Sequence, residues 1–387
     1  MRDYSTMKKC LITLFFVTTL VGCQNQEQPE EQTEIPDGAS NQNNSNNEKN
    51  NEVPDLNQES NNVEQEKQEF KTHSIEGDEE VYLSVEEVTE NLGGDYEYNS
   101  TDKSLTLEIE GREFYFVYEV PVMEVDGVYI PSDEITLKEI DGDPYVSKEF
   151  IEQGLETEYT YEEEEELLSF TWEDEVIDAW ASTGQTEVDI SSLSVSEMIE
   201  YLSFLQEPIE NASVSTVESH LPGAPRIYRN GYHEGIDWYG YSTGTEITTD
   251  TPIRAMADGV VVRVDADFDD YPSHEIRNED LDVAGEVGYT PEYILDRLRG
   301  KQVWVQYEDG VMSRFAHLDS IPEELELGQK VDEETVIGYV GNSGTSGAVD
   351  DDGSGLHLHQ DLLIYGELFW EPYSLEEAHD ILSQLFR

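Results

Sequence analysis

The chain has 387 residues, which exceeds one ordinary domain and favours two folded units joined by connecting segments. Its 88 acidic and 21 basic residues give a formal net charge of -67 at pH 7, which argues against a nucleic-acid-binding protein because like charges repel. This excess of acid fits either a saline habitat, where salt screens the self-repulsion, or an acidic surface that maintains solubility.

The N-terminus has the pattern of a bacterial export signal. Lys8 and Lys9 precede a short apolar run, and residues 20–23 read Leu-Val-Gly-Cys. This tetrapeptide resembles the lipobox, where a peptidase cleaves before a cysteine that then carries lipid. We therefore expect a signal peptide over residues 1–22 and a lipid anchor on Cys23, which would hold the protein outside the cytoplasm at the cell membrane. An ordinary signal peptide cut nearby is the alternative, and it also predicts an extracytoplasmic chain.

Both cysteines of the chain, Cys10 and Cys23, lie in this N-terminal segment. The folded part can therefore hold neither a disulfide nor a thiolate metal site, and any metal must be bound by histidines and carboxylates. Residues 23–70 are rich in Asn, Gln and Glu and nearly lack apolar side chains. Such a segment cannot bury enough surface to offset its chain entropy, which predicts a disordered acidic tether.

Residues 71–173 contain a weak internal repeat. A stretch beginning at Val81 aligns with one beginning at Pro144, and each predicts a strand, a short helix ending near a glycine, and further strands. The pattern resembles the N-terminal domain of copper amine oxidases, which recurs as an accessory module in secreted bacterial proteins. The resemblance implies a small α+β accessory domain that serves as a spacer or binding module. It implies no copper, because no histidine lies between His73 and His220.

Residues 174–225 predict a partly helical linker, with an amphipathic stretch at 195–205 whose apolar residues recur at helical spacing. From residue 226 to residue 387, short stretches of alternating apolar and polar residues dominate. They predict strands at 259–265, 302–307 and 336–340, separated by turns that contain glycine. An all-β domain fits this pattern best.

The segment at about 267–300 is much longer than a hairpin turn between neighbouring strands requires. It is strongly acidic and includes a helical pattern at 291–298 with proline near its start. We expect an inserted flap that borders the active-site groove. A decorative surface insertion is the alternative.

Four of the eight histidines lie in three short motifs of the last region. The motif HEGID places His233 and Asp237 four residues apart, so that both side chains can reach one metal from a turn. The motif HLH places His357 and His359 on one face of a strand, because side chains alternate along a strand. The motif FAHL follows a hydrophobic strand and contains His317. Neutral imidazole and carboxylate groups are suitable ligands for Zn²⁺.

The order of these motifs resembles that of the lysostaphin-like, or LytM-type, zinc metallopeptidases. HEGID, PIRAMADGVVVRV, FAHL, VIGYVGNSGTSG and GLHLH follow one another over most of residues 226–363. The resemblance implies a mainly β fold class, with an antiparallel β-sheet zinc peptidase domain of the duplicated hybrid motif type preceded by the small α+β accessory domain. It also implies one Zn²⁺ held by His233, Asp237 and His359, with a fourth position open to water.

By the same resemblance, His317 and His357 match the two non-ligand histidines of the family. A peptide hydrolase must deprotonate the attacking water and stabilise the oxyanion that follows. His357 is favoured as the base and His317 as the oxyanion stabiliser, and the reverse assignment stays open. One departure is that Gln360 and Asp361 follow HLH, where family members usually carry an aromatic residue and an acid. This departure implies altered support around the ligands.

These features predict a zinc-dependent metalloendopeptidase that hydrolyses peptide bonds in peptidoglycan cross-links or stem peptides. The expected partners are peptidoglycan and the membrane, the latter through the N-terminal lipid, and no nucleic acid. A catalytically inactive family member that acts as a cell-wall-binding scaffold or activator is the alternative. A zinc-binding or solute-binding lipoprotein is a third hypothesis, which explains the anchor and the histidines but not the order of the strand motifs.

Overall fold

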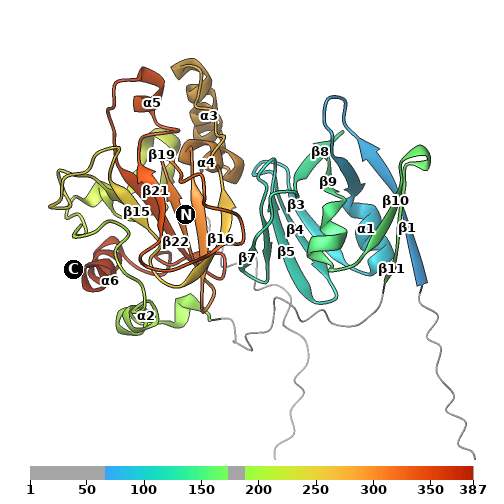
Figure 1. Cartoon of the computed structure of the whole chain (residues 1–387), viewed down its shortest axis with the longest axis horizontal. Helices are drawn as coiled ribbons and strands as arrows, with labels where there is room; N and C mark the ends of the chain where they lie inside the picture. The colour runs from blue at the N-terminus through green and yellow to red at the C-terminus, as the bar shows by residue number, and fades with distance from the viewer. Residues whose placement is uncertain (1–65, 173–187, 387) are drawn as a thin grey trace, which may run out of the picture. The chain divides into compact units, whose positions relative to one another are not determined.

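Antiparallel strands are the main regular elements of the structure, a computed structural model that describes residues 66–172 and 188–386 (Figure 1). The mainly β fold class is therefore confirmed. The expected signal peptide, the expected lipid anchor at Cys23 and the tether up to residue 65 lie outside the described residues. In the part of the chain that is described, no helix has the length and apolar character needed to cross a bilayer.

The N-terminal part, residues 66–172, contains two antiparallel sheets. Their strand orders are β10-β11-β1-β2-β9-β8 and β3-β4-β5-β6-β7. The elements are β1 Glu66–Ser74, β2 Val81–Ser84, α1 Val85–Leu92, β3 Asp95–Asn99, β4 Ser104–Ile109, β5 Arg112–Val117, β6 Met123–Val125, β7 Val128–Ile130, β8 Leu137–Ile140, β9 Asp143–Ser147, η2 Phe150–Gly154, β10 Tyr159–Glu162, η3 Glu163–Glu165 and β11 Leu167–Trp172.

The predicted internal repeat corresponds to two units of similar element order in this part. The first unit is β2, α1, β3 and β4, and the second contains β9, η2, β10 and β11. Helix α1 begins after the N-cap Ser84 and ends at Gly93, whose φ of 78° is a left-handed conformation that favours glycine. In the second unit the helical turn is a π-helix that ends at Gly154.

The expected disorder is wrong for residues 66–70. We expect disorder up to residue 70, but residues 66–70 already belong to β1. This strand pairs with β11 from Glu66 onward, and Phe70 is fully buried in the core of the N-terminal part. The burial of Phe70 and the backbone hydrogen bonds to β11 both help to offset the entropy cost of ordering these residues.

The C-terminal part, residues 188–386, is built around a sheet with the order β14-β22-β18-β17-β16-β20, in which β23 also pairs with β22. Two smaller sheets have the orders β15-β21-β19 and β12-β13. The strands are β12 Pro225–Arg226, β13 Gly231–Tyr232, β14 Ile236–Trp238, β15 Pro252–Arg254, β16 Gly259–Val264, β17 Val303–Tyr307, β18 Val311–Ala316, β19 Leu318–Ser320, β20 Lys330–Val331, β21 Val336–Val340, β22 Leu358–Ile364 and β23 Glu367–Leu368. The helices are η4 Ile190–Ser192, α2 Val195–Tyr201, η5 Glu218–His220, η6 Ile227–Arg229, α3 His274–Val287, α4 Glu292–Arg299, α5 Ser346–Asp350 and α6 Leu375–Leu385.

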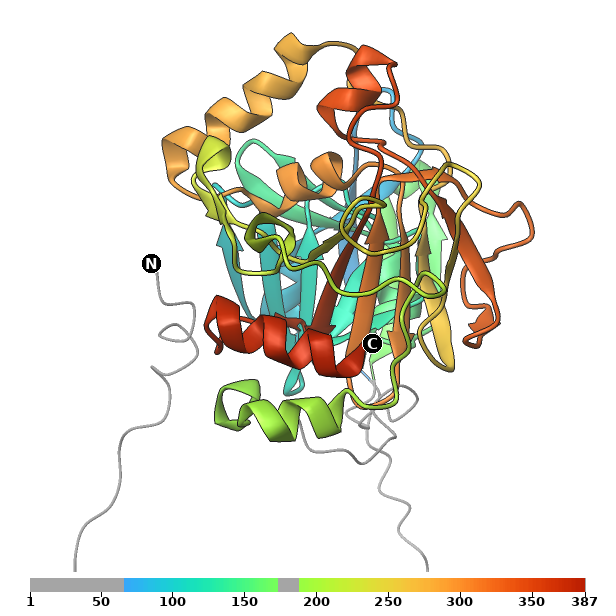
Figure 2. The same ribbon diagram turned by 90° about the vertical axis from the view of Figure 1, so that its left-hand side faces the viewer.

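Helices α2 and α6 lie side by side at one end of the C-terminal part (Figures 1 and 2). Each begins with a capping box, which satisfies amide groups that the first helical turn leaves unpaired. Met198 of α2 and Ile381 of α6 are fully buried and belong to the same hydrophobic cluster as the strands. The expected linker over residues 174–225 therefore differs from the structure, because the chain from Ile190 onward packs into this core.

The strands on either side of the predicted insertion, β16 and β17, pair as antiparallel neighbours, as expected. Helix α4 coincides with the predicted helical pattern and has Pro291 as its N-cap. Helix α3 was not predicted. Figures 1 and 2 show α3 close to α5, at the end of the C-terminal part opposite α2 and α6.

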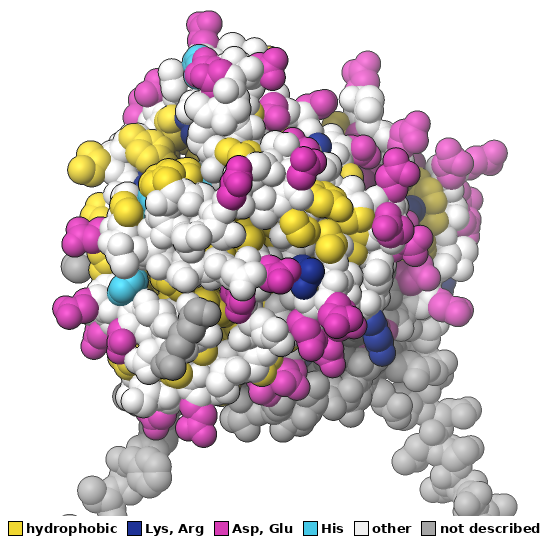
Figure 3. Space-filling view, turned by 60° about the vertical axis from the view of Figure 1, so that its left-hand side comes forward, with side chains coloured by type: hydrophobic (Ala, Val, Ile, Leu, Met, Phe, Trp, Pro, Cys, Tyr) yellow, Lys and Arg dark blue, Asp and Glu magenta, His cyan; other side chains and the backbone are white. Residues whose placement is uncertain are grey.

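Acidic side chains are distributed over the face shown in Figure 3, where lysines and arginines are few. This distribution is what the net charge of -67 requires, and the face offers no basic stripe on which a nucleic acid could bind.

Candidate metal centre

Strand pairing brings two distant motifs together at the candidate centre. In the register of β14 and β22, Asp237 lies directly opposite His359. Cross-strand neighbours of this kind point to the same face of the sheet, with Cβ atoms about 4.5–5.5 Å apart. His233 precedes β14 and is held there by two backbone hydrogen bonds, from its N–H to Ala224 and from Gly223 to its carbonyl. The HEGID and HLH motifs therefore meet on one face.

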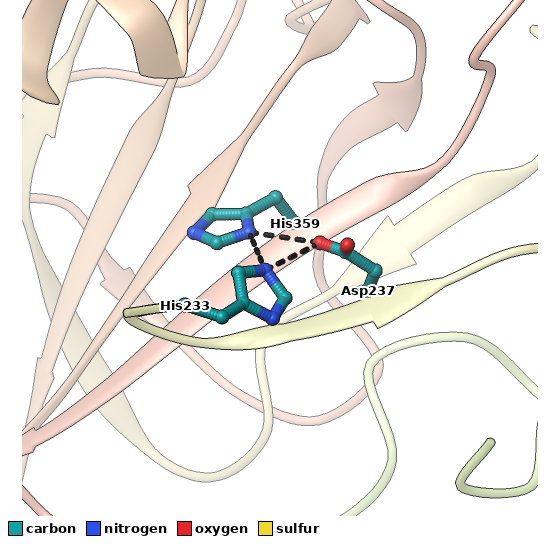
Figure 4. Close-up of side chains that lie close together, drawn as sticks. All are labelled: His233, Asp237 and His359. Carbon is teal, nitrogen blue, oxygen red and sulfur yellow. Dashed lines mark hydrogen bonds and ion pairs between the residues drawn. The ribbon is translucent and has the colours of Figure 1, made fainter. Parts of the chain in front are cut away.

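Three donor atoms converge in this position (Figure 4). Asp237 Oδ1 lies 2.9 Å from His233 Nε2 and 3.0 Å from His359 Nδ1, and the two nitrogens are 3.1 Å apart. All three residues are buried, with exposed fractions of 2%, 5% and 6% for His233, Asp237 and His359. These are the three residues that the sequence resemblance implied as zinc ligands.

The outer nitrogens of both imidazoles are already engaged. His233 Nδ1 donates to the carbonyl of Leu221 at 3.0 Å, and His359 Nε2 donates to Asp361 Oδ1 at 2.8 Å. These partners assign the proton of each neutral ring to its outer nitrogen, so in the neutral rings both inner nitrogens present lone pairs. Two lone pairs and a carboxylate oxygen facing one point form a donor set for a cation, and its composition suits Zn²⁺.

The electrostatics of the ligands also fit a cation. Burial lowers the pKa of His233, which favours the neutral imidazole. Burial would raise the pKa of Asp237, but the neighbouring His233 and His357 outweigh it and hold that pKa well below its usual value. For His359, burial would lower the pKa, whereas the carboxylates of Asp361 and Asp237 raise it to about 9. The site therefore concentrates negative potential where the three donor atoms meet.

His317 lies beside the three donors. Its ring centroid is 4.8 Å from that of His357 and 5.6 Å from that of His359. Its Nδ1 donates to the carbonyl of Ser343 at 2.8 Å, which leaves Nε2 without a proton in the neutral ring. Burial and the nearby His357 and His359 lower its pKa well below the usual value. Burial therefore favours the neutral form of His317, in which Nε2 presents a lone pair.

His357 is placed by an isolated bridge to Gly341, just before β22. Its Nδ1 is hydrogen-bonded to the carbonyl of Gly355, and its Nε2 lies 3.4 Å from Asp237 Oδ1. The structure thus brings together all five residues that the sequence singled out in this domain.

Several residues that contact the centre were missed by the sequence reasoning. Arg226 donates to Asp237 Oδ2 at 2.9 Å. The other oxygen, Oδ1, faces His233 Nε2 and His359 Nδ1. The ring of Tyr239 stacks on His357. Asp361, noted only as a departure from the family pattern, supports His359 and is itself bound by Arg299 at 2.8 Å. Alternation along the strand could have indicated Asp361, because residues 359 and 361 share a face.

The insertion is hydrogen-bonded to the loop that contains α5. Gly344 donates its N–H to Asp270 Oδ1 at 2.6 Å and accepts at its carbonyl from Arg277 Nε at 3.2 Å. His274, the first residue of α3, is half exposed and pairs with Asp350 at 2.7 Å. Since Ser343 in the same loop accepts from His317, the insertion contacts a loop that borders the centre.

Two family models match the chain. Residues 283–368 match the model described as peptidase family M23, and residues 62–170 match the copper amine oxidase N-terminal domain. Both resemblances derived from the sequence are thereby confirmed. The M23 match contains His317, His357 and His359, whereas His233 and Asp237 precede it. No curated protein matches the chain.

Solved structures that resemble the chain include three peptidases. A zinc-containing peptidase from Vibrio cholerae is 18% identical, with a TM-score of 0.28, over 43% of this chain and 38% of its own. The catalytic domain of the prophage-encoded M23 protein EnpA from Enterococcus faecalis is 20% identical, with a TM-score of 0.26, over 42% of this chain and 92% of its own. The catalytic domain of lysostaphin from Staphylococcus simulans is 19% identical, with a TM-score of 0.23, over 41% of this chain and 82% of its own. The match spans less than half of the Vibrio cholerae chain, and function is therefore inferred from the residues of the centre.

Proposed function

We propose that this chain, which carries a peptidase family M23 region, is a zinc-dependent endopeptidase that hydrolyses peptide bonds in bacterial peptidoglycan. The observation that supports this function best is the convergence of His233 Nε2, Asp237 Oδ1 and His359 Nδ1, with both outer imidazole nitrogens engaged elsewhere. Three protein ligands with a further open position are typical of catalytic zinc, whereas structural zinc usually has four.

When bound, Zn²⁺ supplies Lewis-acid chemistry and lowers the pKa of water to near 7. His233, Asp237 and His359 would hold the ion. Their burial excludes bulk water, which strengthens each electrostatic interaction in the centre. Peptidoglycan is the proposed substrate because the family match implies it.

The hydrogen bonds of the two remaining histidines are alike, so both assignments of the base and the oxyanion stabiliser stay open. Neutral His317 offers a lone pair on Nε2 and no N–H, so it is suited to accept a proton from the attacking water. His357 Nδ1 likewise faces a backbone carbonyl, that of Gly355, so its Nε2 also presents a lone pair in the neutral ring. Whichever ring accepts the proton of the attacking water can then donate it to the leaving amine, while the other faces the oxyanion.

We also propose that the chain acts outside the cytoplasm, held at the membrane by lipid on Cys23. This anchor is tested by Cys23→Ser, because a hydroxyl is a far poorer nucleophile than a thiolate for lipid attachment. The variant should no longer partition with membranes in a detergent-dependent manner. Unchanged partitioning would contradict the anchor and leave the hydrolase proposal intact.

The hydrolase is tested by digesting purified peptidoglycans of different cross-link type with the zinc-loaded chain and identifying new amino termini. His233→Ala, Asp237→Ala and His359→Ala should each lose zinc and activity together, because the site has only three ligands. His379→Ala, a histidine of α6 outside the centre, is the matched control and should retain both. Stoichiometric zinc without cleavage of any peptidoglycan would instead favour a zinc-binding or solute-binding lipoprotein.

A further inference from the structure

The insertion rejoins the sheet at Arg299, which contacts both sides of the candidate metal centre. Arg299 is the last residue of α4 and is only 5% exposed. Its Nε donates to Asp361 Oδ2 at 2.8 Å. Its backbone carbonyl accepts from the N–H of His317, also at 2.8 Å. One residue of the insertion therefore reaches His359 through Asp361 and reaches His317 directly.

Asp361 links Arg299 to the ligand His359. It is fully buried, and its two oxygens have different partners, since Oδ1 accepts from His359 Nε2 at 2.8 Å while Oδ2 accepts from Arg299. Arg314 is 3.9 Å from the same Oδ2, which is too long for a hydrogen bond. A buried carboxylate requires a cation that also donates a hydrogen bond, and Arg299 meets that requirement.

The backbone after Arg299 is fixed by close contacts. Gly300 has a φ of 69°, and a Cβ at this position would lie 2.4 Å from the carbonyl carbon of Ser343. Lys301 donates its N–H to Ser343 Oγ at 2.9 Å. The carbonyl of Ser343 in turn accepts from His317 Nδ1. Arg299 is thus held in place by the loop that also orients His317.

We propose that Arg299 is a positioning residue for the metal centre. It fixes Asp361, which holds the proton of His359 on Nε2 and so turns the Nδ1 lone pair toward His233 and Asp237. The inference rests on the proposed function in so far as His359 is a zinc ligand. It also assigns a role to the insertion, because Arg299 at the end of α4 supports the centre.

The test measures the zinc affinity of the full chain by competition with a chelator, together with the melting temperature. Arg299→Gln should weaken zinc binding about 10- to 100-fold, the range expected when the support of a metal-binding histidine is removed. Arg299→Lys keeps the charge without the planar donor fork and should recover part of the affinity. Arg297→Gln removes a charge from the same helix, where the side chain is 47% exposed and binds Asp280, and should bind zinc like the wild type.

Because Arg299→Gln leaves a buried carboxylate without its partner, Asp361→Asn and the double variant are measured as well. The double variant removes both charges at similar volume and should fold. If Arg299 acts through Asp361, the double variant should bind zinc at least as tightly as the single variant that has the lower zinc affinity. Additive losses in the double variant, or wild-type affinity in folded Arg299→Gln, would overturn the inference. A wild-type chain that binds zinc but cleaves no peptidoglycan would contradict the proposed function and leave the positioning role standing.

Discussion

Tyr239 stacks face to face on His357, with ring centroids 4.3 Å apart and an interplanar angle of 8°. Tyr239 follows β14 directly, so the strand that carries Asp237 also leads into the ring that fixes the plane of His357. The stack and the hydrogen bond from His357 Nδ1 to Gly355 together direct Nε2 toward the centre.

Replacing Tyr239 with leucine should therefore lower kcat while zinc content stays unchanged. An aromatic pair contributes about 0.5–1.5 kcal/mol beyond its buried area, which corresponds to a loss of about 2- to 10-fold in rate if the stack orients His357. Tyr239→Phe keeps the stacked ring and serves as the control, with a rate near that of the wild type. Equal losses in the two variants would point to the hydroxyl group and would contradict an orienting stack.

His317→Ala and His357→Ala should each keep zinc and the fold while losing most of the hydrolytic rate. Neither ring contributes to the three converging donor atoms, and proton-transfer or oxyanion groups typically contribute on the order of 10²–10⁴-fold. Zinc content by metal analysis and kcat on a soluble wall peptide check this expectation. Loss of the metal in either variant would mean that the replaced histidine is a zinc ligand and that its assignment as a catalytic residue is wrong.

Zinc affinity should increase with pH. Without metal, burial would lower the pKa of His359, but the carboxylates of Asp361 and Asp237 raise it to about 9. Below that pKa the ring carries a second proton, and a protonated imidazole cannot bind a metal, so zinc must displace one proton. The apparent affinity should then fall about tenfold for each pH unit below 9, or ~100-fold between pH 8 and pH 6.

Calorimetry in buffers of different ionisation heat provides the readout, since it counts the protons released when zinc binds. About one proton should leave the centre at pH 7. The lowered pKa of His233 means that this ring contributes little to the count. An affinity independent of pH would contradict the protonation that the two carboxylates impose on His359.

Asp270→Ala should loosen the loop that contains α5. Asp270 Oδ1 accepts from the N–H of Gly344 at 2.6 Å, and a hydrogen bond to a charged group contributes about 1.5–3 kcal/mol. Hydrogen exchange of peptides covering residues 342–355 should therefore become about 10- to 100-fold faster. Asp269→Ala, at an exposed neighbouring position, is the control and should leave exchange unchanged. Unchanged exchange in both variants would show that the insertion does not restrain this loop.

The order of the motifs in the sequence led to five candidate residues, and the structure places these five near one another. The alternation of HLH along a strand could be read locally, because His357 and His359 are two positions apart. The register that places Asp237 opposite His359 could not be read, since these residues are 122 positions apart and only the folded sheet brings them together.

The supporting residues were harder to predict for the same reason. Arg299 is 62 positions from Asp361 and lies at the end of an insertion, where no local pattern indicates a buried arginine. Helix α3 has few apolar residues and buries only Asp280 and Ala284, so its sequence lacks the periodic signal that reveals most helices. In contrast, α4 buries Ile294 and Leu295 and was predicted.

The pairing of Glu66 with Trp172 in β1 and β11 means that the N-terminal part starts and finishes at the same point. Its two chain ends are separated by about one strand spacing, ~5 Å, although the part contains more than a hundred residues. A folded unit whose ends meet can be added to or removed from a polypeptide without displacing what precedes or follows it. Such a unit is connected as a side branch and not in series, so it contributes little end-to-end length of its own. Of the two roles expected for it, binding is therefore favoured over spacing.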